Sequence, residues 1–399
     1  MDEIDTYNYI LRQKRASLIG GEVKMKIEFF RHSISDDDIV RVNQVLKSIF
    51  LTTGEYVCQF EKQFASYLGC REVVGLTSCT AALHLSLLAC GIGHGDEVIT
   101  TPQTFIATAN AVLHAGATPV FIDVEPDTGN IDASLIEYAI TPKTKAIIPV
   151  HLYGQLCDMI SIRKIADRYG LVIIEDAAHS IESVRDGIRP GQLGDAACFS
   201  FYATKNITSG EGGAVATNSP EIAEKIRLLR LHGMTKGASD RYTGRYQHWD
   251  MEVCGWKYNM DNIQAALLLG QLERIEEQLG KRERIARRYE EEFKNIEVLD
   301  FPKIKPDAKS ARHLFTIWVE PKERDRVLWG LQDQGIGVAV NFRAIHLLKF
   351  YREKYHYKRG MFPEAERIGD STISIPLYPD LKKEEIEFII NSVKKVILP

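Results

Sequence analysis

A single lysine, Lys205, lies inside residues 199–213, where the sequence reads FSFYATKNITSGEGG. The residues before it are apolar and aromatic, and those after it are rich in glycine. Lysine is rarely buried unless it is paired or functional. An amine with a reference pKa of about 10.4 acts as a nucleophile or base near neutral pH only when desolvation or a cationic neighbour lowers that pKa. The apolar end of a strand would desolvate Lys205, so we consider it a candidate nucleophile as well as an ordinary surface charge.

Three other apolar runs end in residues that could do chemistry. LVIIED ends in Asp176, VITTPQTF ends in Phe105, and GLTSCT ends in residues 77–80, which are rich in hydroxyls and open a helical pattern. In open α/β sheets, ligands bind at the carboxyl ends of the strands. We therefore expect an amine, a carboxylate, an aromatic ring and a helix N-terminus to meet at one edge of a sheet.

These groups are the ones that pyridoxal phosphate requires, since it needs a lysine for an imine, a carboxylate beside its pyridine nitrogen and a cradle for its phosphate. Asp176 would keep a proton on the ring nitrogen, and Phe105 would lie flat on the ring. Hydroxyls and free amides at the helix start, with Ser200, would hold the phosphate. Each residue taken alone could also have a purely structural role, because Ser78 and Thr80 are good N-caps and Phe105 would suit a core. Their occurrence together favours the cofactor.

The elements that would position these residues alternate between strand and helix. Short apolar runs typical of buried strands lie between residues 72 and 217: EVVGLT, EVITT, TPVFIDV, KAIIPVHL, LVIIED, AACFSF and GGAVAT. Helical patterns such as CTAALHLSLLACGI and SIRKIADRYG separate several of them. Alternation of this kind predicts an α/β fold with a mostly parallel sheet covered on both faces.

The chain has 399 residues, which favours one large domain and a smaller one. We expect residues 1–24 to be an N-terminal extension and residues 25–261 to be the large α/β domain. Residues 262–294 show one long helical pattern that would connect the two domains. Residues 295–399 would form a small α+β domain, with a final helix from Lys382.

Composition excludes several classes of protein. The net charge of −4 leaves no basic surplus for nucleic acid. The basic run at residues 280–288 alternates with acidic and apolar residues, so we interpret it as a solvated helix face. Seven scattered cysteines without a CxxC pair argue against a disulfide framework or a metal site and favour a reducing, cytoplasmic setting. Residues 98–122 carry no charge, but prolines, glycine and polar residues interrupt them, so we expect strand, loop, helix, turn and strand rather than a membrane span.

From about Ile27 to the C-terminus, the sequence resembles the DegT/DnrJ/StrS family of nucleotide-sugar aminotransferases, which have the aspartate-aminotransferase-like fold, fold type I. The resemblance rests on TSCTAALHLSLLACGIGHGDEVITTPQTF, IEDAAHS, FSFYATKNITSGEGGAVATN and KYNMDNIQAALLLGQL, in the family's order and spacing. It implies that Lys205 binds pyridoxal phosphate as an imine, that Asp176 pairs with the pyridine nitrogen and that Phe105 stacks on the ring. It places Ser78, Cys79, Thr80 and Ser200 around the phosphate.

The resemblance also implies that Asn259 reaches the phosphate of the neighbouring subunit, and thus a homodimer with a shared active site. The sequence departs from the family at two positions. Cys79 stands where glycine or alanine is usual, so a backbone contact is expected there. His179 stands where many members have glutamine.

Together with His179, the segments DRYTGRYQ, GWKYN and NFRAIHLLKFYREKY most resemble the subgroup that makes UDP-4-amino-4-deoxy-L-arabinose. In that subgroup His179 would lie over the cofactor beside Asp176, and His346 would lie near the substrate. Arg343 and Arg245 are candidates to bind the two phosphates of the nucleotide sugar. The implied reaction moves an amino group from L-glutamate to a UDP-4-keto-pentose and releases 2-oxoglutarate.

Three alternatives remain open. A dehydratase on the same fold would carry histidine in place of Lys205. The second alternative is amination at carbon 3, or of another sugar. Examples of such a sugar are a GDP-linked 4-keto-6-deoxyhexose and a UDP-linked 4-keto-6-deoxy amino sugar. A sensor without enzymatic activity is the third, and it would be expected to have lost part of the constellation or gained a DNA-binding module.

Overall fold

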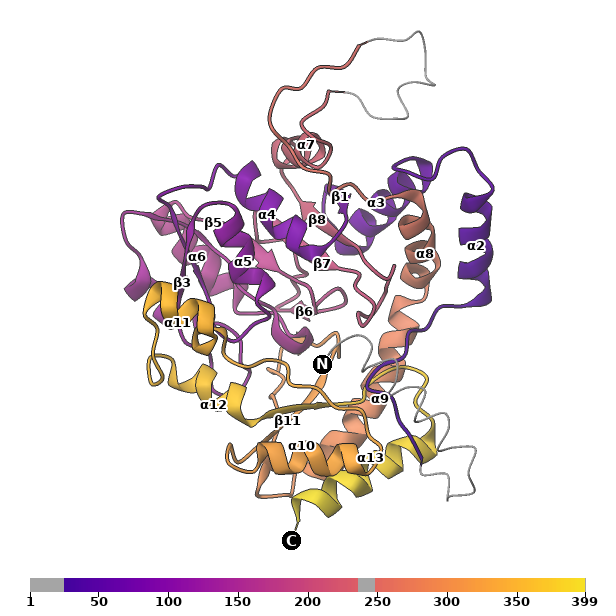
Figure 1. Ribbon diagram of the computed structural model, residues 1–399, viewed down its shortest axis with the longest axis vertical. Helices are drawn as coiled ribbons and strands as arrows, with labels where there is room; N and C mark the ends of the chain where they lie inside the picture. The colour runs from indigo at the N-terminus through magenta and orange to yellow at the C-terminus, as the bar shows by residue number, and fades with distance from the viewer. Residues whose placement is uncertain (1–24, 236–247, 399) are drawn as a thin grey trace.

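The computed structural model describes residues 25–235 and 248–398, and a seven-stranded sheet forms its centre (Figure 1). The strand order is β1-β8-β7-β5-β4-β2-β3. Neighbouring strands from β7 to β3 run parallel, whereas β8 is antiparallel to both β1 and β7. The strands are β1 Glu72–Leu76, β2 Glu97–Thr100, β3 Thr118–Phe121, β4 Thr144–Ile147, β5 Val172–Asp176, β7 Ala196–Ser200 and β8 Gly213–Thr217. The predicted α/β class and mostly parallel sheet are confirmed.

The central strands cross a core that is closed on both faces. All five residues of β7 and all five of β8 are buried, which explains their uninterrupted apolar sequences. The helices that cover the large sheet are α3 Glu55–Leu68, α4 Cys79–Ala89, α5 Ala107–His114, α6 Met159–Tyr169 and α7 Pro220–Leu229. Helix α4 is buried on nearly every side, since it packs against β7 and β8 and against α5 and α7.

The predicted helix over residues 262–294 is two helices, α8 Asn262–Glu273 and α9 Ile275–Phe293, which meet at Arg274. Each packs in a different core. Leu268 of α8 lies in a cluster with β7 and β8, whereas Tyr289 of α9 lies in a cluster with C-terminal elements. Arg274 has φ −100° and ψ 3°, and its guanidinium pairs at 2.6 Å with Asp38 of α2, Asp36–Leu46. The break lets the chain turn from one core to the other.

The C-terminal region builds a second, smaller layer at the bottom of Figure 1. Its three-stranded sheet has the order β12-β11-β9, and α9, α10 and α13 pack around it. The chain near Ile27 joins this core through a bridge to Ile336, although residues 25–261 were assigned to the large domain from the sequence. The remaining elements are β6 Val184–Arg185, β9 Leu299–Asp300, β10 Ala308–Lys309, β11 Phe315–Val319, α10 Arg324–Asp333, α11 Lys349–Tyr355, α12 Pro363–Ser371, β12 Thr372–Ile375 and α13 Lys383–Ile397.

The uncharged stretch at residues 98–122 forms β2, α5 and β3, as predicted. Within residues 25–235 and 248–398, no helix combines the length and the apolar character needed to cross a membrane.

Candidate active site

A cavity of about 530 Å³ opens at the carboxyl ends of the central strands. Most of the predicted site residues line it, although they come from four separate parts of the large domain. They are Ser78, Cys79, Thr80, Phe105, Asp176, His179, Ser200 and Lys205. The expectation that the strand ends converge on one site is therefore met by the geometry.

Lys205 lies in the turn after β7, where its backbone N–H donates to the carbonyl of Tyr202 at 2.9 Å. Its side chain is half-buried in the wall of the cavity. Burial lowers the pKa of Lys205 to about 8, while the nearby Cys79 and Asp176 act in the opposite direction. The unprotonated amine, which a nucleophile or base requires, then makes up roughly a tenth of the total at pH 7 and about half at pH 8.

Asp176 is the last residue of β5 and is 6% exposed. Its carboxylate accepts hydrogen bonds from the Thr108 hydroxyl at 2.7 Å and from the Ala178 backbone N–H at 3.2 Å. Burial raises the pKa of Asp176, and these hydrogen bonds together with Lys205 partly oppose that shift. A buried carboxylate that needs a cationic partner suits a protonated pyridine nitrogen.

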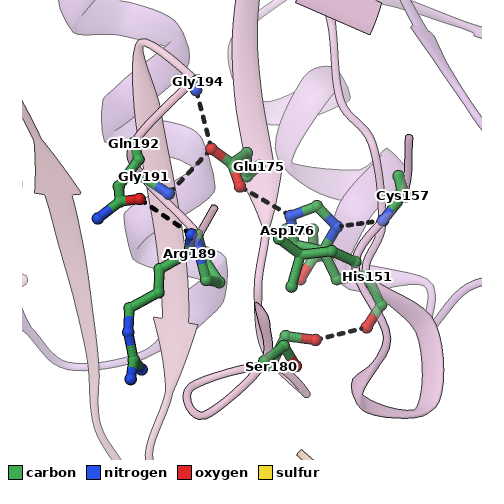
Figure 2. Close-up of polar contacts among 12 residues, drawn as sticks. His151, Cys157, Glu175, Asp176, Ser180, Arg189, Gly191, Gln192 and Gly194 are labelled. Atoms are coloured by element: carbon green, nitrogen blue, oxygen red, sulfur yellow. Dashed lines mark hydrogen bonds and ion pairs between the residues drawn. The ribbon is translucent and has the colours of Figure 1, made fainter. Parts of the chain in front are cut away.

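A buried hydrogen bond between His151 and Glu175 holds the end of β5 in place (Figure 2). The Nε2 of His151 lies 2.8 Å from Oε2 of Glu175, and Oε1 of Glu175 accepts the backbone N–H groups of Gly191 and Gly194, each at 2.9 Å. The Nδ1 of His151 accepts the backbone N–H of Cys157 at 3.2 Å, so Nε2 carries the proton that faces Glu175. A side chain at Gly194 would place Cβ 2.4 Å from Oε1 of Glu175. This scaffold fixes the strand whose next residue is Asp176.

The N-terminus of α4 provides an anion-binding site. Ser78 is its N-cap and accepts the Ala81 N–H at 3.1 Å, whereas the first amides of a helix, here those of Cys79 and Thr80, have no partner within the helix. A Cβ at Gly213 would lie 2.3 Å from the carbonyl carbon of Ser78, so only glycine lets β8 approach this turn. The residues present therefore fit a phosphate group.

Aromatic and imidazole rings form the wall opposite these polar groups. Phe105 is 54% exposed although it lines the cavity, and its ring centroid lies 5.7 Å from that of Phe342. His179 is 9% exposed, and its ring stacks on Phe342 at 5.9 Å. Burial holds the pKa of His179 well below its usual range, so its ring is neutral. An exposed aromatic face beside Lys205 suits a flat aromatic cofactor.

The structure does not bring His346 to the cavity. It is fully buried, its Nε2 lies 3.0 Å from Oε1 of Glu366, and its ring packs edge-on against Phe362. His346 was expected near the substrate, but its side chain packs in the core and does not line the cavity. Arg343 is exposed and is not among the residues that line the cavity. Arg245 lies outside the described residues.

Asn259 also lies outside the lining of the cavity of its own chain. Its Nδ2 donates to the Thr53 hydroxyl at 2.7 Å, and its Oδ1 accepts from Lys257. Since the predicted contact is with a second copy of the chain, the role of Asn259 stays a prediction.

Sequence reasoning missed three residues of the site: Thr108, His151 and His313. Thr108 contacts Asp176, whereas His151 and His313 line the cavity. A signal for Thr108 was present, because Thr104 and Thr108 are four residues apart at a helix start, and their hydroxyls lie 2.8 Å apart. No local signal existed for His313, which comes from the C-terminal region, more than 100 residues after Lys205.

Comparison with known proteins supports the same assignment. The sequence pattern of the DegT/DnrJ/EryC1/StrS aminotransferase family matches residues 32–394. The spore coat polysaccharide biosynthesis protein SpsC of Bacillus subtilis is 43% identical over 370 residues, which cover 91% of this chain and 95% of SpsC.

Two solved structures are similar over almost the whole chain. The putative sugar aminotransferase Spr1654 of Streptococcus pneumoniae in its PMP form has a TM-score of 0.88 and 32% identity, covering 93% of this chain and 98% of Spr1654. It has also been solved in a PLP form. PseC of Helicobacter pylori, an aminotransferase involved in the biosynthesis of pseudoaminic acid, has a TM-score of 0.87 and 31% identity, covering 94% of this chain and 99% of PseC. From its match over residues 32–394 and the cavity built around Lys205, the chain belongs to the DegT/DnrJ/EryC1/StrS aminotransferase family, with pyridoxal phosphate as cofactor.

Proposed function

We propose that this enzyme transfers the amino group of L-glutamate to a 4-keto sugar carried on a nucleoside diphosphate, which yields a 4-amino-4-deoxy sugar and 2-oxoglutarate. The observation that carries the proposal is the meeting of Lys205, Asp176 and the N-terminus of α4 in one cavity. The names of SpsC and PseC support a sugar as the amino acceptor, since both belong to the synthesis of sugar products.

Lys205 is the group that moves protons. Bound pyridoxal phosphate supplies an electron sink that stabilises negative charge on a substrate carbon. With a pKa of about 8, the Lys205 amine can take the proton from the α-carbon of glutamate and, in the second half of the cycle, deliver a proton to carbon 4 of the sugar.

The other residues orient and protect the reacting atoms. Asp176 would accept a hydrogen bond from a protonated ring nitrogen of the cofactor and would thereby keep that nitrogen positive. Phe105 and Phe342 cover the cavity with apolar surface, which limits access of water to the reacting carbon. The amides of Cys79 and Thr80, with the Ser200 hydroxyl, would hold the phosphate.

For the acceptor we propose a UDP-4-keto-pentose, on the resemblance of the segments around His179 and residues 341–355 to the aminoarabinose subgroup. A keto-6-deoxyhexose is the second candidate, because SpsC and PseC are named for products other than aminoarabinose. Arg343 and Arg245 are the proposed contacts for the two phosphates, and Asn259 would complete the phosphate site of a second copy in a homodimer.

The experiment that tests the proposal separates the two halves of the cycle. Protein loaded with pyridoxal phosphate is mixed with L-glutamate, and the visible absorbance of the cofactor is followed while 2-oxoglutarate is assayed. We expect the visible band to fade with release of one 2-oxoglutarate for each active site. Persistence of the band with glutamate and with other amino acids would refute amino transfer.

A further inference from the structure

His313 lines the cavity from the C-terminal side and is 6% exposed. Its ring lies against that of His179, with the centroids 4.3 Å apart. Its Nδ1 lies 3.0 Å from Oδ1 of Asn206, the residue directly after Lys205. Among the described residues its Nε2 has no hydrogen-bond partner. Hence one nitrogen of His313, a residue of the cavity lining, is held by Asn206, and the other makes no hydrogen bond to the described residues.

The orientation of the Asn206 amide is determined by its other contacts. Its Nδ2 lies 2.8 Å and 3.1 Å from the two carboxylate oxygens of Glu182 and 3.0 Å from the carbonyl oxygen of Ala311. All three of these oxygens are acceptors, so the amide nitrogen must face them and the amide oxygen must face His313.

Arg282 of α9 forms a buried ion pair with Glu182, which opposes the rise in the pKa of Glu182 that burial causes. Arg282 lies in the basic run at residues 280–288, which the sequence suggested is a solvated helix face, yet it is 2% exposed. Arg282 is buried because it pairs with Glu182, whose charge would otherwise be unpaired in the interior.

The network fixes the tautomer of His313. Because Oδ1 of Asn206 can only accept, Nδ1 of His313 must carry the ring proton. The remaining nitrogen, Nε2, then has a lone pair and no proton. Burial and the nearby His179 and Lys205 hold the pKa of His313 well below its usual range, so the ring stays neutral.

We propose that His313 is a further substrate-binding residue, whose Nε2 accepts a hydrogen bond from a hydroxyl of the sugar acceptor; this inference rests on the proposed function. A neutral acceptor gives no attraction to the carboxylates of glutamate or to the phosphates, which bring no proton to donate at neutral pH. A sugar hydroxyl, the ammonium of glutamate and the amine of Lys205 can each donate a hydrogen bond, as can the hydroxyls of Ser200 and Tyr202 in the lining of the cavity. Of these donors, only the sugar hydroxyl is confined to the second half of the cycle.

The tautomer is tested without substrate or cofactor. In protein labelled with 15N-histidine, the ring signal of His313 is assigned by its loss in the His313→Asn variant. We expect a neutral ring with the proton on Nδ1, unchanged from pH 6 to pH 8. In Asn206→Ala, which removes the acceptor at Nδ1, we expect a mixture of tautomers. A proton on Nε2 in the unaltered protein would overturn the inference.

The contact with the sugar hydroxyl is tested with two substitutions, each of which replaces a different ring nitrogen of His313 with an amide group. His313→Gln can place an acceptor near the position of Nε2, whereas His313→Asn keeps only the donor toward Asn206. Both halves of the cycle are measured for each variant, with glutamate for the first and UDP-4-keto-pentose or a nucleotide-linked keto-hexose for the second. Loss of one hydrogen bond predicts that His313→Asn slows the sugar half about 5- to 10-fold, with a smaller loss in His313→Gln.

The glutamate half is expected to change by less than about twofold in both variants, since a bond to the sugar is absent there. Equal slowing of both halves in His313→Asn would mean that Nε2 accepts from a group present in both halves, such as Lys205, and would overturn the sugar contact. Equal rates for the two variants in the sugar half would also overturn it. A different result would refute the proposed function itself: no reaction of the unaltered enzyme with glutamate.

Discussion

The hydroxyl of Thr108 donates a hydrogen bond of 2.7 Å to the carboxylate of Asp176. Since that hydroxyl has one proton, its contact with Thr104 at 2.8 Å must be one in which Thr108 accepts. A hydrogen bond to a charged group contributes about 1.5–3 kcal/mol. Thr108→Val should therefore raise the pKa of Asp176 further and weaken binding of pyridoxal phosphate roughly 10- to 100-fold. Cofactor titration followed by absorbance measures this change.

Thr108→Ser is the matched control, because it keeps the hydroxyl and removes only a methyl group. It should bind the cofactor within a few-fold of the unaltered protein. Equal losses in the valine and serine variants would mean that packing, not the hydrogen bond to Asp176, is what matters at this position.

The depressed pKa of Lys205 predicts how reactivity depends on pH. The unprotonated amine is the reactive form, so the rate at which cofactor-free protein captures pyridoxal phosphate should rise with pH and reach half its maximum near pH 8. Between this pH and about 10.4 the unfolded chain binds more protons at Lys205 than the folded chain, so this residue makes stability rise with pH. Stopped-flow absorbance gives the rate. A rate that still climbs tenfold per pH unit from pH 8 to pH 9 would contradict the shift.

Gly213 should tolerate no side chain. A Cβ there would meet the backbone of Ser78 at 2.3 Å, so Gly213→Ala should destabilise the fold by about 1–3 kcal/mol and displace the start of α4. Denaturant unfolding and cofactor titration measure both effects. Gly280→Ala is the control: a Cβ in this part of α9 meets only Arg284 at 3.8 Å, so helix propensity should stabilise the protein by about 0.5–1 kcal/mol. Full cofactor affinity in Gly213→Ala would contradict the close approach.

His346 should act on stability and not on substrate. His346→Leu removes its hydrogen bond with Glu366 and its edge-on packing on Phe362, which should cost about 1–3 kcal/mol of unfolding free energy. The KM for the sugar should not change, because His346 does not line the cavity. A raised KM at unchanged stability would restore the role predicted from the sequence.

Buried histidines should also make the protein sensitive to acid. The pKa values of His84, His179, His313 and His346 are lowered, mainly by burial. Below about pH 6.5 the unfolded chain takes up protons that the folded rings do not, so stability should fall as the pH drops from 7 to 5. Thermal unfolding across this range tests the direction. His346→Leu should flatten part of the slope, whereas an unchanged slope would exclude a contribution from His346.

The sequence predicted those parts of the site that lie at the ends of strands. Asp176 and Lys205 each follow a buried apolar run, and the parallel arrangement of such runs brings their carboxyl ends together. The partners of these residues could not be predicted in the same way. His313 reaches the cavity through the packing of the C-terminal region, and the pairing of Glu182 with Arg282 joins residues 100 positions apart.

Helical periodicity had a similar limit. It correctly indicated helix on both sides of Arg274, but it gave no sign that the two halves bury their apolar faces in different cores. Local pattern determines which residues form an element, whereas the contacts that break or bury it depend on the tertiary arrangement. The burial of His346 is another example, because its partner Glu366 belongs to α12.

The most direct measurement starts from enzyme that has reacted with excess L-glutamate and has then been desalted. Nucleotide-linked 4-keto sugars are added one at a time, and the visible absorbance of the cofactor is followed in the unaltered protein and in Lys205→Ala. We expect the visible band to return with a UDP-4-keto-pentose in the unaltered protein, and the Lys205→Ala variant to show no amino transfer. Return of the band only with a keto-hexose would replace the proposed sugar. No return with any nucleotide-linked keto sugar would contradict the central claim that this cavity aminates such sugars.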